Sequence, residues 1–88
     1  MTYTKPAISG YTIYTISNCK FCKMAKEHLA KSKMKTKIVN CDTHIETLRK
    51  RDEFYAFIRS YTSIPYTYFP MIFYNGKFVG GYKELVKH

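Results

Sequence analysis

The chain has 88 residues, 45% apolar and 17% aromatic, which suffices for one core and predicts a single domain. No stretch reaches the roughly 18 apolar residues of a membrane span, and residues 1–10 lack a signal peptide's apolar core, so we expect a soluble cytoplasmic protein without a membrane partner. The formal net charge is +9, but the basic residues are scattered without a run of five or six, so we do not expect nucleic acid as a partner.

The first half of the chain predicts a strand, a helix and a second strand. Residues 1–10 show no period and predict a loose lead-in to a domain over residues 11–88. Residues 11–16 are β-branched and aromatic and predict a strand. Ser17 or Asn18 would cap a helix whose apolar positions recur every three or four residues as far as Lys33. Residues 36–41 predict another strand, which this order makes parallel to the first.

The second half predicts a helix, a hairpin and a closing helix. Asp42 or Thr43 would cap the helix, which ends near residues 60–63. Its apolar side contains Ile45, Leu48, Tyr55 and Ile58. Strands over residues 71–74 and 77–79 flank Asn75–Gly76, a pair that tolerates the positive φ of a tight turn, and residues 82–87 predict the last helix. The order β-α-β-α-β-β-α predicts an α/β fold with one four-stranded mixed sheet flanked by helices.

Two cysteines, Cys19 and Cys22, stand where the first strand passes into the first helix. Such a pair can close a small disulfide ring, and a thiol at a helix start faces N–H groups that have no intrahelical partner. Only a thiolate attacks a disulfide, so we expect the helix start, Lys20 and Lys23 to lower the pKa of Cys19. Cys19 would attack, and Cys22, one turn further in, would release the product.

The same cysteines also permit a zinc site. Cys41 and His44 follow with C-x-x-H spacing, so these two and the cysteine pair would make four tetrahedral ligands. However, residues 23–33 continue as a helix without glycine, whereas zinc modules usually turn sharply after their second cysteine. We therefore favour the redox pair, with Cys41 as a half-buried thiol and both His28 and His44 solvated. A third reading is a non-enzymatic binding module that uses the positive charge together with Tyr66 and Tyr68.

Three segments resemble the small dithiol members of the glutaredoxin family. They are Cys19-Lys20-Phe21-Cys22 at the strand–helix junction, Phe69-Pro70-Met71-Ile72-Phe73-Tyr74-Asn75-Gly76, and Gly80-Gly81 before a polar helix. The resemblance covers nearly all of residues 11–88 and implies a thioredoxin-like fold. It also implies reduction of protein disulfides and glutathione mixed disulfides, with glutathione as co-substrate and no metal. Ribonucleotide reductase is the electron acceptor that the family suggests, and we expect a monomer.

The resemblance also assigns roles to residues. It implies Cys19 as nucleophile, Cys22 as resolving thiol and Pro70 as a cis-proline that faces them. The residues implied to contact glutathione are Phe21, Phe69, Pro70, Gly81, Tyr82 and Lys83.

Three positions depart from the usual family pattern. Lys20 replaces a proline, Ile16 a lysine that pairs with a glutathione carboxylate, and Lys83 an acidic residue. Some family members bridge an iron–sulfur cluster between two copies. Those usually have small residues between the cysteines, whereas this chain has Lys20 and Phe21.

Overall fold

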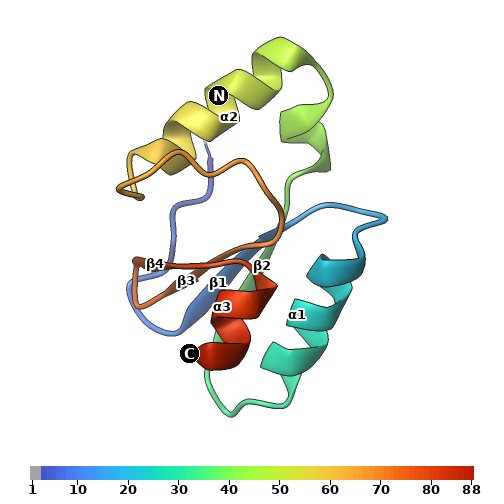
Figure 1. Cartoon of the computed structure of the whole chain (residues 1–88). Helices are drawn as coiled ribbons and strands as arrows, with labels where there is room; N and C mark the ends of the chain where they lie inside the picture. Colours follow the sequence, from blue (N-terminus) through green and yellow to red (C-terminus); the bar gives the residue numbers. More distant parts are fainter. Residues whose placement is uncertain (1–2) are drawn as a thin grey trace.

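Four strands form one mixed sheet in the order β2-β1-β3-β4 in the computed structural model, which describes residues 3–88 (Figure 1). The central strand β1 (Tyr11–Thr15) is parallel to β2 (Thr36–Asn40) and antiparallel to β3 (Met71–Tyr74). At the other edge, β4 (Lys77–Gly80) pairs antiparallel with β3. The predicted four-stranded mixed sheet of a thioredoxin-like fold is confirmed.

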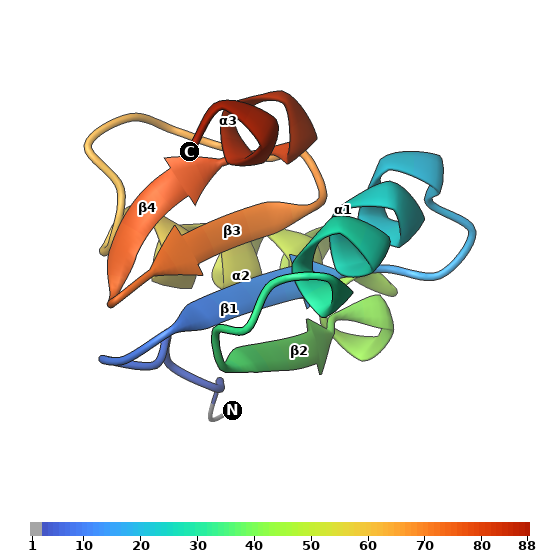
Figure 2. The ribbon, with the colours of Figure 1, turned by 90° about the horizontal axis from the view of Figure 1, so that it is seen from below.

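Helices cover both faces of this sheet (Figure 2). Two of them, α1 (Lys20–Ala30) and α3 (Tyr82–Lys87), lie on one face, and α2 (Leu48–Arg59) lies on the other. Successive strand residues point to opposite faces, so the buried side chains form two clusters. The α1/α3 side contains Ile13, Ala25, Leu29, Ile72 and Leu85, and the α2 side contains Tyr14, Cys41, Phe54, Ile58, Met71 and Phe73. No helix in the described part of the chain is long and apolar enough to span a membrane.

Helix α1 begins and ends at other residues than the sequence predicted. Its N-cap is Cys19 instead of Ser17 or Asn18. The Ser17 hydroxyl is bonded to Asp42, and Asn18 has a positive φ of 56°, so neither residue takes the capping position. The helix ends at Ala30, before Lys33.

The single helix predicted after Asp42 is two elements. A short 3₁₀ turn, η1 (Asp42–Ile45), comes first, and α2 begins only after Thr47, whose hydroxyl accepts a hydrogen bond of 3.1 Å from the Lys50 N–H. Leu48, predicted on the apolar side, is 70% exposed. Burial begins six residues later, at Phe54, because the first turn of α2 does not reach the α2-side cluster.

The lead-in over residues 3–10 contains no helix or strand, but it is not loose. Tyr3 packs against the α2-side cluster, with its ring 5.6 Å from that of Phe54. The buried Tyr14 hydroxyl donates a 2.6 Å hydrogen bond to the Thr4 carbonyl. These contacts make the segment part of the packed domain. The first two residues of the predicted lead-in lie outside the described part of the chain.

Candidate active site

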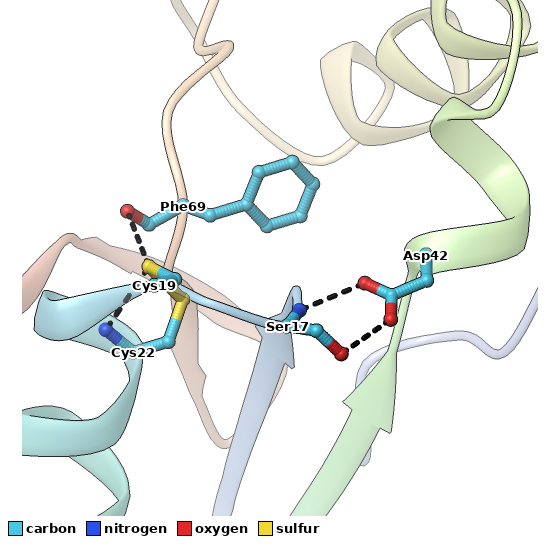
Figure 3. The surroundings of a disulfide bond; sticks show 5 residues. All are labelled: Ser17, Cys19, Cys22, Asp42 and Phe69. Atoms are coloured by element: carbon cyan, nitrogen blue, oxygen red, sulfur yellow. Dashed lines mark hydrogen bonds between the residues drawn. A yellow bond between two sulfur atoms is a disulfide. The ribbon is translucent and has the colours of Figure 1, made fainter.

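Cys19 and Cys22 form a disulfide at the start of α1, with their Cα atoms 5.2 Å apart (Figure 3). The Cys19 sulfur occupies the N-cap position and accepts a hydrogen bond of 3.2 Å from the Cys22 N–H. Cys22 is 1% exposed, whereas Cys19 is only half-buried. The more accessible cysteine is thus also the one whose sulfur faces a helix N–H group, which favours Cys19 as the nucleophile once the pair is reduced.

The peptide bond between Phe69 and Pro70 is cis, as predicted, and it lies against the disulfide. The Phe69 carbonyl oxygen is 3.9 Å from the Cys19 sulfur (Figure 3). The Phe69 ring points away from the sulfurs and stacks on Phe54 of α2, at 6.1 Å between centroids and 10° between planes. Packing on α2 therefore holds the backbone that faces the redox pair.

A hollow of about 170 Å³, which we call the aromatic hollow, adjoins this backbone. It is lined by Phe21, Tyr66, Phe69, Pro70, Gly81, Tyr82, Lys83 and Glu84. All six residues implied to contact glutathione are among them, although they come from the start of α1, the segment before β3 and the start of α3. The exposed Phe21 ring lies 6.2 Å from that of Tyr82, so it forms one rim of the hollow.

Two residues of the aromatic hollow, Tyr66 and Glu84, are not among the implied glutathione contacts, and sequence analysis named Tyr66 only as part of a non-enzymatic binding surface. Tyr66 lies in an irregular segment and gives no periodic signal, but its ring packs edge-on against Phe78 at 4.9 Å. Burial, with help from the nearby Glu84 carboxylate, raises the pKa of Tyr66, so its hydroxyl stays protonated and can donate. Glu84 did have a signal, because it stands three residues after the N-cap Gly81 and accepts a 2.8 Å hydrogen bond from the Gly81 N–H.

A second hollow of about 380 Å³, which we call the basic hollow, includes Cys19 itself. Its lining consists of Ile16, Ser17, Asn18, Cys19, Lys20, Lys23 and Lys26. Lys20 and Lys23, predicted to favour the Cys19 thiolate, are thus placed beside that residue. Their effect on its ionisation remains a prediction.

The loop between β1 and α1 is tied to the end of β2 by Asp42. Its carboxylate accepts a 2.8 Å hydrogen bond from the Ser17 N–H and another from the Ser17 hydroxyl (Figure 3). These bonds favour the charged form and hold the pKa of Asp42 below its usual value. These two hydrogen bonds therefore fix the loop that leads to Cys19 to the segment that follows β2.

The structure does not assemble the alternative zinc site. Cys41 is fully buried in the α2-side cluster, and burial raises the pKa of its thiol to about 12. His44 is not solvated as predicted, because its ring stacks on Phe54 at 5.4 Å and 10°. Within residues 3–88, no group of three or more His, Cys, Asp or Glu side chains is placed to hold a metal ion. The four predicted zinc ligands are therefore not brought together, because Cys41 is buried in the α2-side cluster.

Comparison with solved structures finds glutaredoxins. Glutaredoxin 1 from Francisella tularensis, in complex with cacodylate, has 25% identity and a TM-score of 0.69 over 88% of this chain and 87% of that one. Glutaredoxin C1 from Populus tremula x tremuloides, in its holo form, has 20% identity and a TM-score of 0.68 over 90% and 72%. A buckwheat glutaredoxin–glutathione complex has 17% identity and a TM-score of 0.67 over 88% and 64%.

The comparison with curated proteins found no match. The family model described as Glutaredoxin matches residues 11–79, most of the chain, from the first residue of β1 into β4. That span contains the cysteine pair at the start of α1 and the cis-proline before β3. The family model, the order of the strands and this redox pair agree, and the chain therefore belongs to the glutaredoxin family of thiol–disulfide oxidoreductases.

Proposed function

We propose that this protein is a glutathione-dependent oxidoreductase that reduces glutathione mixed disulfides and protein disulfides through Cys19 and Cys22. The observation that carries the proposal is the half-buried Cys19 at the helix N-cap, with the aromatic hollow adjoining the Phe69 backbone that faces its sulfur. The buckwheat glutaredoxin named above was solved with glutathione, which supports use of the same thiol here.

Glutathione is a small charged peptide with a central cysteine, and the site offers a partner to each part. The backbone of Phe69 would pair with the cysteine portion, as an added strand does. Phe21 and Tyr82 would cover its apolar surface. Lys83 and the N–H groups near Gly81 would bind its charged end. A glutathione carboxylate would then replace Glu84 as the acceptor of the Gly81 N–H.

For a glutathione mixed disulfide, the Cys19 thiolate attacks the glutathione sulfur. A bond forms between these two sulfurs, the bond to the substrate sulfur breaks, and the substrate leaves as a thiolate that takes a proton from water. A second glutathione thiolate then attacks the bound glutathione sulfur. Glutathione disulfide is released, and Cys19 returns as a thiolate.

For a protein disulfide, Cys19 first forms a mixed disulfide with one substrate sulfur. The Cys22 thiolate then attacks the Cys19 sulfur, which produces the disulfide seen here and releases the substrate dithiol. Two glutathione molecules reduce that disulfide and leave as glutathione disulfide. We further propose that the protein acts as a cytoplasmic monomer, with ribonucleotide reductase among its substrates.

The test is turnover of a small glutathione mixed disulfide by the wild type, Cys19→Ser and Cys22→Ser. We expect Cys19→Ser to abolish turnover, because no other described thiol is accessible. Cys22→Ser should retain substantial activity on this substrate, since a second glutathione can replace Cys22, but it should lose most activity on a protein disulfide. Equal activity of all three proteins on the small substrate would refute the mechanism.

A further inference from the structure

We propose that the basic hollow receives the protein half of the substrate, and that this protein prefers disulfides flanked by acidic residues. The inference rests on the proposed function and adds the substrate class. It starts from two hollows that are lined by different residues. One contains Cys19, and the other adjoins Phe69, whose carbonyl oxygen faces the Cys19 sulfur. The aromatic hollow has the lining expected for glutathione, and the basic hollow contains Cys19 itself.

The chemistry requires room on two sides of the nucleophile. When Cys19 attacks a glutathione mixed disulfide, its sulfur, the glutathione sulfur and the leaving protein sulfur are joined in one transition state. Glutathione occupies the aromatic hollow in the proposed function, so the chain that carries the leaving sulfur needs another surface next to Cys19. The basic hollow, at about 380 Å³ against about 170 Å³, offers the larger of the two spaces.

The charge of the basic hollow selects the partner. Lys20, Lys23 and Lys26 lie about one turn apart along α1, so they line the side of the helix that begins at the nucleophile. No acidic side chain is among the lining residues, and the nearby Asp42 carboxylate is already bonded to Ser17. Three lysines without a carboxylate partner in this lining attract acidic segments and repel basic ones, which affects the rate of encounter most strongly.

The test compares glutathionylated peptides that differ only in whether Asp and Glu, Ser, or Lys flank the cysteine. At low salt we expect kcat/KM to fall from the acidic to the basic peptide, and Lys26→Glu to lower it about fivefold for the acidic peptide. The difference should disappear at about 1 M salt, where the screening length is about 3 Å. A glutathione mixed disulfide of a small neutral thiol has no acidic segment to place in the basic hollow, so Lys26→Glu should change its kcat/KM much less than that of the acidic peptide.

Lys77→Glu is the matched control, because Lys77 is exposed at the start of β4, at the opposite end of the sheet from Cys19. It changes the net charge equally and should leave the acidic-peptide rate nearly unchanged. Equal rates for the acidic and basic peptides, or an equal loss in both variants, would overturn the proposal.

A binding measurement separates this proposal from the proposed function. Fluorescence anisotropy of a labelled acidic peptide without cysteine needs no turnover, and we expect Lys26→Glu to weaken binding while Lys77→Glu does not. Absence of turnover on the small substrate would refute the proposed function alone, and the anisotropy result would still decide the surface. Tighter binding of a single-stranded oligonucleotide of equal charge would overturn the assignment to an acidic protein segment.

Discussion

At the scale of single residues, the Tyr66 hydroxyl in the aromatic hollow occupies the space that a side chain at Gly81 would take. A Cβ atom at this position would lie 2.7 Å from the Tyr66 hydroxyl oxygen, closer than such atoms approach. The Tyr66 ring packs edge-on against Phe78, so moving its hydroxyl away from a new methyl group would also disturb that ring contact. We expect Gly81→Ala to lower the free energy of unfolding by about 1–3 kcal/mol, as overpacking does, and to raise KM for a glutathione mixed disulfide.

The double variant identifies the cause of that loss. Tyr66→Phe removes only the hydroxyl that the new methyl group would meet, so Gly81→Ala with Tyr66→Phe should recover most of the stability lost by Gly81→Ala. Urea denaturation of the wild type, both single variants and the double variant completes the cycle. Simple addition of the two single effects would show that the hydroxyl is not the obstacle.

The surroundings of His44 allow a second prediction about the free energy of unfolding. Its Nδ1 atom is buried and finds no hydrogen-bond partner among the described residues, while the ring stacks on Phe54. His44→Phe keeps the stacked ring and removes the unpaired polar atom, so we expect the free energy of unfolding to rise by about 1 kcal/mol at pH 7. His28→Phe, on the exposed side of α1, should change it by less than about 0.5 kcal/mol. A loss of stability in His44→Phe would contradict this account.

At the scale of elements, α2 supports the active site through Phe54. This fully buried ring packs on Phe69, whose backbone carbonyl faces the Cys19 sulfur. We expect Phe54→Ala to lower the free energy of unfolding by about 3–5 kcal/mol and to reduce activity under conditions where the protein is still folded. Leu48→Ala on the same helix is the control, and its 70% exposure predicts a change within about 0.5 kcal/mol. Comparable urea midpoints for the two variants would be inconsistent with this packing.

The connection between Ser17 and Asp42 joins the β1–α1 loop to the start of η1, and its contribution depends on pH. The pKa of Asp42 in the folded protein is below its usual value of 3.8, so the carboxylate stabilises the fold above pH 3.8. That stabilisation is lost as the pH falls through the lower folded pKa. We expect Asp42→Ala to be less stable than the wild type at pH 7, and the difference to narrow below pH 3.8. Urea unfolding at pH 7 and at a pH below 3.8 measures this difference in the free energy of unfolding. Asp52→Ala is the control, because Asp52 is exposed. A pH-independent difference would exclude the charge as its origin.

The sequence correctly predicted those elements that depend on residues close together in the chain. Asn75 and Gly76 both have positive φ, 51° and 82°, and form the predicted turn. The start of α1 was missed because a contact distant in sequence decides it. Ser17 was a good cap by type, but Asp42, 25 positions away, bonds its hydroxyl. Tyr66 was expected only on a non-enzymatic binding surface, because nothing local in the sequence shows that folding places its hydroxyl against Gly81.

At the scale of the whole molecule, positive charge is spread over the surface with little compensation. The chain has 15 lysines and arginines against six acidic residues. Within residues 3–88 the structure shows two ion pairs, Arg49–Glu53 and Lys50–Glu46, both four residues apart and near the start of α2. Exposed pairs of this kind contribute little. Most lysines therefore repel one another, and this repulsion opposes the compact state.

Salt should stabilise this protein for that reason. Raising NaCl from a few millimolar to about 0.15 M shortens the screening length to about 8 Å, which weakens repulsion between lysines on different elements. We expect the free energy of unfolding to rise by about 1 kcal/mol, which for a domain of this size moves the Tm up by about 4–8 °C. Lys35→Glu with Lys37→Glu exchanges two exposed positive charges for negative ones and lowers the net charge from +9 to +5. Its Tm should depend less on salt than that of the wild type. A wild-type Tm that is constant or falls over this range would show that repulsion is not what limits its stability.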